Sequence, residues 1–163
     1  MQSEFDEAIE EDTQKGKYLT FSLGNEAYAV EIEFVKEIVN IMPITKLPEL
    51  PSYVKGIISL RESIIPVIDL RIRLHMQEIP YTSRTCVIIL NVFESQIGFI
   101  VDEVKEVIDI AEENVVPPPS FKTSGENRFL KAIGKTTGSV KLILDSEKLI
   151  TEDECASIMG VVS

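Results

Sequence analysis

The most restrictive feature of this 163-residue sequence is an internal repeat. The segment VKEIV at 35–39 returns as VKEVI at 104–108, a shift of 69 positions. A second block matches at a shift of 76, with YVKGI (53–57) over FLKAI (129–133) and PVID (66–69) over LILD (142–145). Short matches also arise by chance in chains rich in Val, Ile, Lys and Glu. Two blocks in the same order, with the added residues near a Pro-rich segment at 117–128, favour a structural duplication.

The duplicated segments have the composition of β-strands. Turn residues at Gly24-Asn25, Arg61-Glu62 and Thr137-Gly138 separate apolar runs, which predicts hairpins at 18–32, 54–74 and 129–146. Further strands are expected at 85–92, 96–104 and 106–110, with Pro66 at an edge or a bulge. We therefore expect a mostly β fold of two similar small barrels, each of about five strands, which share an apolar interface with a cleft between them.

The expected domain organisation follows from these strands. We expect residues 1–16 to form an acidic, disordered tail and residues 17–150 to form the β domain, with subdomains at 17–80 and 81–150. At 151–163 we expect a short C-terminal helix and tail, because Thr151 is a suitable N-cap with Glu154 three residues later. The segment 117–128 is expected to be an exposed loop.

Charge and cysteine content restrict the partners and the compartment. The net charge is −11, and six acidic residues with no basic residue stand within the first twelve positions. This sign disfavours sequence-independent binding of nucleic acid and contact with anionic lipid. The chain starts without a signal-peptide pattern and holds no long apolar run, and its two cysteines lack a CxxC context. We expect a cytoplasmic protein with free thiols.

Residues for catalysis are not grouped in the sequence. His75 is the single histidine and is interpreted as a surface residue, and the phosphate-binding glycine motifs are absent. Asp69 and Asp145 resemble a carboxylate pair, but they occupy equivalent repeat positions at strand ends, which favours local hydrogen bonding. We expect no enzymatic activity, no catalytic residues, no cofactor and no metal. An apolar groove with charged rims between the barrels, suited to a partner helix, is the sharpest functional inference from the residues.

Several segments together resemble the CheW family of bacterial chemotaxis coupling proteins. They are YLTFSLGNEAYAVEI, VKEIV, VKGIISLRESIIPVIDLRIRL, IGFIVDEVKEVIDI and VKLILDSEKLI. The family's central pattern is roughly Gly-x-x-Asn-Leu-Arg-Gly-x-x-x-Pro-Val-x-Asp-Leu-Arg. The matching residues are Gly56, Leu60, Arg61, Pro66, Val67, Asp69, Leu70 and Arg71. Ser59 and Glu62 depart from the Asn and Gly positions, and Glu adopts a positive φ less readily than Gly.

The resemblance implies a fold of two SH3-like β-barrels side by side and the role of a non-catalytic adaptor. The implied partners are the cytoplasmic tip of a methyl-accepting chemotaxis receptor and the regulatory domain of the histidine kinase CheA, with other CheW copies in rings. The resemblance places the protein in receptor arrays at the inner face of the membrane. Carried over by position, the implied receptor groove consists of Val35, Glu37, Val39, Gly56 and Arg61 on one side and Val104 and Val107 on the other.

Two further roles follow from the same resemblance. Glu37 and Arg61 are expected to pair and to order the groove rim, and Phe121 is the expected contact to the kinase. Alternatives are an adaptor of a non-motility chemosensory kinase pathway and, from the residues, a small-barrel nucleic-acid binder. The second alternative needs a basic face and exposed aromatic residues. The charge of −11 and the aromatic content of 7% argue against it.

Overall fold

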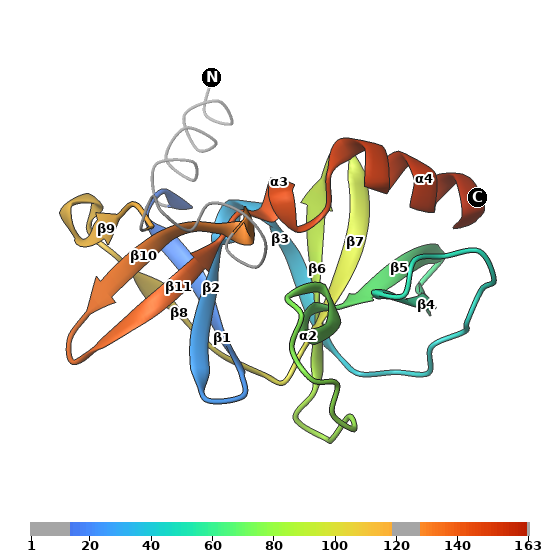
Figure 1. Cartoon of the computed structure of the whole chain (residues 1–163), viewed down its shortest axis with the longest axis horizontal. Helices are drawn as coiled ribbons and strands as arrows, with labels where there is room; N and C mark the ends of the chain where they lie inside the picture. Colours follow the sequence, from blue (N-terminus) through green and yellow to red (C-terminus); the bar gives the residue numbers. More distant parts are fainter. Residues whose placement is uncertain (1–13, 119–127, 163) are drawn as a thin grey trace, which may run out of the picture.

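The computed structural model describes residues 14–118 and 128–162, which form two β-sheets and a C-terminal helix (Figure 1). In the first sequence copy the elements are β1 (Lys17–Leu23), β2 (Glu26–Glu31), η1 (Ile32–Phe34), β3 (Val35–Asn40), β4 (Val54–Leu60), β5 (Ser63–Asp69) and α2 (Leu70–Arg73). In the second they are β6 (Cys86–Val92), β7 (Ser95–Val101), β8 (Glu103–Asp109), η2 (Glu112–Asn114), β9 (Val115–Val116), β10 (Leu130–Thr136), β11 (Ser139–Leu144) and α3 (Ser146–Leu149), followed by α4 (Glu152–Val162).

Each sheet combines strands from both sequence copies. Sheet A has the order β8-β1-β2-β11-β10-β9, and sheet B has the order β3-β6-β7-β5-β4 (Figure 1). The β1–β2 hairpin therefore pairs with strands of the second copy, and the β6–β7 hairpin pairs with strands of the first. The parallel pairs β2–β11 and β5–β7 join the exchanged hairpins to their sheets. The expected boundary between 17–80 and 81–150 separates the two sequence copies, whereas both sheets cross it.

The two copies correspond strand by strand, including their β-bulges. One extra residue interrupts the pairing of β3 between Val35 and Glu37, and β8 has the same irregularity opposite Leu19 and Phe21. In β4 and β10 the extra residues are Lys55 and Lys131. The repeated Val-Lys-Glu segments thus mark a bulge in each copy, where an edge strand bends.

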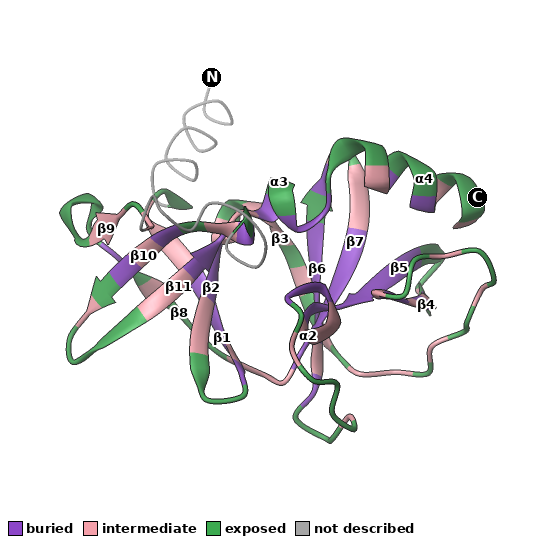
Figure 2. Cartoon of the chain, viewed as in Figure 1, coloured by how far each residue is buried: buried purple, intermediate pink, exposed green. Residues whose placement is uncertain are grey.

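Three apolar clusters form the core. Figure 2 shows buried residues along the strands of both sheets. The central cluster lies between the sheets, and its largest fully buried side chains include Phe21, Phe99 and Phe129. A second cluster, with Val87 and Ile89, lies on the other face of sheet B, and a third lies on the other face of sheet A. β6 contributes to two clusters because alternate side chains point to opposite faces, which explains its continuous apolar sequence. The mostly β, two-sheet fold confirms the expected fold class.

A short helix replaces the end of one expected strand. The run at 63–74 was expected to be a single strand, but the strand ends at Asp69 and α2 begins at Leu70. The Asp69 carboxylate accepts hydrogen bonds from the backbone amides of Arg71 and Ile72. Asp145 accepts the equivalent bond from Glu147 at the start of α3. Both aspartates are therefore N-caps of the short helices that follow their strands. This agrees with the expected local hydrogen bonding and not with a carboxylate pair.

The C-terminal helix begins with the expected capping box. The Thr151 hydroxyl accepts a hydrogen bond from the Glu154 amide at 3.1 Å, and the Glu154 carboxylate accepts one from the Thr151 amide at 2.9 Å. Cys155 and Ile158 of α4 are buried in the central cluster. Among residues 14–118 and 128–162, no helix is long and apolar enough to cross a membrane.

Glu62, one of the two departures from the family pattern, is accommodated at the β4–β5 turn. Leu60 pairs with Ser63, so Arg61 and Glu62 form a two-residue turn. The positive φ of 56° belongs to Arg61, so the Glu62 position does not need glycine. Pro66 pairs with Ile57 of β4, whereas β7 joins β5 only from Val67 onward, so Pro66 occupies a local edge as expected.

Candidate docking surface on the edge strands

β3 presents an alternating surface at one edge of sheet B. Val35, Glu37 and Val39 are half-buried, while Lys36, Ile38 and Asn40 are exposed. Val35 packs against the central cluster and Val39 packs against the cluster of sheet B. The valines are therefore partly core and partly surface, as expected from their aliphatic sequence.

A bidentate ion pair joins β3 to the β4–β5 turn. Arg61 Nη1 donates to Glu37 Oε1 at 2.5 Å, and Arg61 Nη2 donates to Glu37 Oε2 at 3.0 Å. The hydrogen bond from Arg61 is the main reason that the pKa of Glu37 is lowered. The Arg61 side chain is 71% exposed and that of Glu37 is 22% exposed. β3 and β4 are the two edge strands of sheet B. The expected ion pair therefore connects the β3 edge of this sheet to the turn that follows the β4 edge.

Gly56 lies beneath the chain that follows β3. It is buried, with φ of 150°, and a Cβ atom there would lie 2.2 Å from the Thr45 carbonyl oxygen. Thr45 and Ile57 exchange two backbone hydrogen bonds, of 2.9 and 2.8 Å, which fix this close approach. Close packing against the Thr45 backbone therefore explains why this position is a glycine, and it fixes the segment that follows β3.

β8 occupies the equivalent edge in sheet A. Val104 is half-buried and packs against the central cluster, and Val107 is 52% exposed. The Thr20 hydroxyl donates to the Glu106 carbonyl at 2.8 Å and accepts from the Glu106 amide at 3.1 Å. These two bonds provide hydrogen-bond partners for the backbone of the bulge. Val35 and Val104 therefore border the same central cluster from opposite sheets. Phe121 lies outside the described residues.

An ion-pair network that sequence reasoning missed ties the two sheets together. Arg71 Nε donates to Asp102 Oδ1 at 2.8 Å, and Arg71 Nη2 donates to Asp102 Oδ2 at 2.6 Å. The Gly24 amide donates to the same carboxylate at 2.7 Å. Burial opposes ionisation of Asp102, but the bonds from Arg71 and Gly24 outweigh it and lower its pKa. α2 is thereby fixed to the β1–β2 turn and to the β7–β8 junction.

A second unpredicted network attaches α4 to sheet B. Arg73 Nη2 donates to Glu154 Oε1 at 2.6 Å, and the Tyr53 hydroxyl donates to Glu154 Oε2 at 2.9 Å. The Arg73 guanidinium also lies 4.2 Å from the centre of the Tyr53 ring, and Arg73 Nε donates to the Leu149 carbonyl at 2.8 Å. Burial, followed by the bond to Glu154, raises the pKa of Tyr53 to about 12. The sequence held one indication that Arg73 is buried: at the repeat shift of 76 it corresponds to Leu149, an apolar residue.

Comparison with protein families and solved structures finds consistent similarity over most of the chain. The family model described as CheW-like domain matches residues 17–154. The Chemotaxis protein CheW of Klebsiella aerogenes is 33% identical over 150 residues, which cover 92% of this chain and 90% of the relative. The protein of the same name from Treponema pallidum is 36% identical over 147 residues, which cover 88% of this chain and 86% of that relative.

A solved structure is similar to this chain in both fold and sequence. The crystal structure of the scaffolding protein TtCheW from Thermoanaerobacter tengcongensis matches with a TM-score of 0.78 and 37% identity. The match covers 85% of this chain and 94% of that structure. The two-sheet arrangement is therefore shared with a solved relative.

Proposed function

The chain belongs to the CheW family, and from this membership we propose that it is a non-catalytic adaptor that couples chemotaxis receptors to the histidine kinase CheA. Its partners are the helical cytoplasmic tip of a methyl-accepting receptor and the regulatory domain of the kinase, with further copies of the family in rings. It acts in the cytoplasm, within receptor arrays at the inner face of the membrane. It uses no cofactor or metal in this role.

The Glu37–Arg61 pair is the observation that supports this proposal most directly. A bidentate pair holds both side chains in one geometry on the surface, next to the half-buried valines of β3. Aliphatic side chains beside oriented charges suit the apolar and polar faces of a partner helix. We propose that Val35, Glu37, Val39 and Arg61 contact the receptor from sheet B, that Val104 and Val107 contact it from sheet A, and that Gly56 supports the sheet B side.

Receptor-controlled kinase activity tests the proposal. Purified receptor signalling fragments, CheA and this protein are combined, and phosphorylation of the kinase is measured with and without receptor. We expect strong receptor control with the unchanged chain and its loss with Arg61→Glu, which reverses the charge beside Glu37. Lys135→Glu is the matched control, because Lys135 is an exposed β10 residue that forms no ion pair within the described ranges. Equal control of the kinase by both variants would show that the surface is assigned wrongly.

A charge exchange separates an ordering role of Arg61 from direct contact. In Glu37→Arg combined with Arg61→Glu, the ion pair can form again with reversed polarity. Recovery of receptor control would mean that the pair mainly orders the rim. Continued loss would mean that the receptor contacts at least one of the two charges directly. Circular dichroism before the assay checks that each variant retains the β fold.

The kinase contact and the pathway are separate parts of the proposal. Following the family resemblance, we propose that Phe121 contacts the regulatory domain of CheA. Phe121→Ala is expected to weaken co-elution with the kinase while receptor binding persists. A pull-down from the native cytoplasm identifies the kinase and receptors, and recovery of a kinase without motility receptors would assign the protein to a non-motility pathway.

A further inference from the structure

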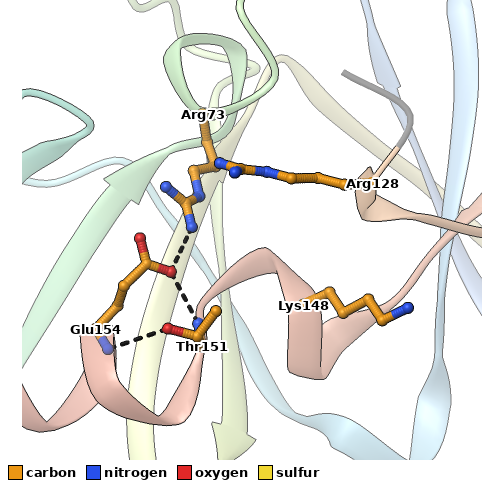
Figure 3. A pocket seen from close by; sticks show the side chains of 5 residues that line it. All are labelled: Arg73, Arg128, Lys148, Thr151 and Glu154. Atoms are coloured by element: carbon orange, nitrogen blue, oxygen red, sulfur yellow. Dashed lines mark hydrogen bonds and ion pairs between the residues drawn. The ribbon is translucent and has the colours of Figure 1, made fainter. Parts of the chain in front are cut away.

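We propose that the pocket between α2, α3 and α4 is a binding site for a phosphate group. The pocket has a volume of about 390 Å³ and is lined by Arg73, Arg128, Lys148, Thr151 and Glu154 (Figure 3). None of these residues belongs to β3, β8 or the β4–β5 turn, and the proposal does not depend on the adaptor role.

Positive charge gathers in this pocket although the whole chain is acidic. Three cationic side chains and one carboxylate give the lining a formal charge of +2, in a chain whose net charge is −11. A phosphate group carries about −1.5 to −2 charges at neutral pH, whereas a carboxylate carries one. The lining charge therefore matches a phosphate dianion better than an acidic side chain of a partner protein.

The guanidinium groups of the two arginines both lie near the same aromatic ring. The guanidinium carbons of Arg73 and Arg128 lie 5.0 Å and 4.6 Å from the centre of the Phe129 ring. Figure 3 shows the Arg128 side chain extended toward Arg73. Two like charges in this arrangement repel each other, and a bound anion would remove that repulsion. Guanidinium groups are also the side chains best suited to bidentate recognition of phosphate.

Hydrogen-bonding capacity remains after the internal partners are satisfied. The Arg73 side chain is only 6% exposed, and its Nε and Nη2 are occupied by Leu149 and Glu154, but Nη1 makes no bond within the described residues. Arg128 forms no ion pair with those residues, and its guanidinium lies over the Phe129 ring. The Lys148 ammonium is likewise unpaired within those residues and points away from the arginines in Figure 3, so it contributes mainly through its charge.

The start of α4 is not the source of the proposed affinity. The Thr151 amide and hydroxyl are already engaged with Glu154 in the capping box. The Glu154 carboxylate is in turn held by Arg73 and Tyr53, which keeps it from occupying the space near Arg128. The binding groups are therefore Arg128 and Arg73 Nη1, which has no partner among residues 14–118 and 128–162, with Lys148 as an additional charge.

Titration of the whole chain with inorganic phosphate, followed by amide NMR at constant ionic strength, tests this site. We expect saturable shifts at Arg128, Lys148 and Thr151, and roughly tenfold weaker binding for Arg128→Gln, the usual effect of losing one charge-assisted contact. Arg84→Gln is the matched control, since Arg84 is an exposed arginine without an ion pair in the described ranges, and it should bind like the unchanged chain.

Two further ligands sharpen the result. O-phosphoserine distinguishes a free phosphate from a phosphorylated side chain, and saturation by either one supports the site. Acetate at the same ionic strength should bind several-fold more weakly. Shifts that grow linearly without saturation for both phosphate ligands, equal binding by Arg128→Gln, or acetate binding as tight as phosphate would each overturn the proposal.

Discussion

The bulges in β3 and β8 occupy equivalent positions in the two sequence copies, yet different groups surround them. Opposite the β8 bulge, the Thr20 hydroxyl bonds both the amide and the carbonyl of Glu106. The equivalent residue opposite the β3 bulge is Ile89, which is fully buried. In the first copy the conspicuous polar group is instead the Glu37 carboxylate, which Arg61 holds.

The same bulged edge strand therefore occurs with two different sets of side chains around it. Glu106 corresponds to Glu37, but the residue that corresponds to Arg61 is Thr137, so a matching ion pair cannot form. Both edges expose an apolar residue at the equivalent position, Ile38 at 40% and Val107 at 52%. They differ in their charges, because Glu37 of β3 is paired with Arg61, whereas the ion pair on β8 joins Lys105 to Glu103. Duplication preserved the strands and bulges, and the two edges then diverged in chemistry.

The largest expected difference between the copies concerns Gly56 and its equivalent, Ala132. Gly56→Ala places a Cβ atom against the Thr45 carbonyl at a positive φ, and we expect a loss of roughly 3 kcal/mol or more in unfolding free energy. Ala132→Gly should cost only about 0.5–1 kcal/mol. Urea denaturation measures both values. Similar losses for the two variants would mean that the chain after β3 moves away easily.

The next effect concerns the hydroxyl at the β8 bulge. Thr20→Val keeps the shape of the side chain but leaves the Glu106 amide and carbonyl without this partner, so we expect a loss of about 1–3 kcal/mol. The matched change in the other copy is Ile89→Val, which removes one methyl group and should cost about 0.5–1.5 kcal/mol. Denaturation curves for both variants test the order. The interpretation of the bulge fails if Ile89→Val is the more costly change.

Tyr53 and Phe129 occupy equivalent positions and differ by one hydroxyl group. Tyr53→Phe removes the bond to Glu154 and should cost about 1 kcal/mol at neutral pH. The pKa of Tyr53 in the folded protein is about 12, above the ordinary value of 10.0. The contribution of the Tyr53 hydroxyl to the unfolding free energy is therefore complete below pH 10 and falls as the pH rises toward 12. Alkaline denaturation should show this decline in the unchanged chain. A decline of the same size in Tyr53→Phe would assign it to other tyrosines.

The smallest effect on stability is expected at the exposed ion pair. Arg61→Gln should leave the unfolding free energy within experimental scatter, because exposed pairs contribute little. The pKa of Glu37 should nevertheless rise toward its ordinary value, since the bond from Arg61 is the main cause of the lowering. NMR titration of the glutamate side chains measures this change, with Arg84→Gln as the control. An unchanged pKa would mean that the pair does not persist in solution.

The repeat predicted most of the strands but not which of them share a sheet. Alternating apolar residues and turn residues are local signals, and both hairpin turns that flank β4 and β10 follow from them. The exchange of the β1–β2 and β6–β7 hairpins has no local signal, because equivalent hairpins fit either sheet with the same apolar face. Only the packing of the whole chain distinguishes the two arrangements.

The candidate docking surface and the ion pairs were predictable only in part. Glu37 and Arg61 were expected to pair from the family resemblance, and the pair forms. Arg73 stood in an alternating apolar run that predicted a strand, and the Asp69 cap turned that run into α2. Its guanidinium is buried because Glu154, which is 81 residues later, provides the compensating charge. Such long-range compensation leaves no mark in the local sequence.

The exchange of hairpins makes the chain the intramolecular counterpart of a domain-swapped dimer. Cutting the chain in the segment 76–84, between the copies, would give two fragments, neither of which contains the strands of a complete sheet. Each fragment would have to recruit the other, so folding would become dependent on concentration. The covalent link replaces that requirement with a high effective concentration of the second copy. In the intact chain, assembly of the two sheets is therefore independent of dilution.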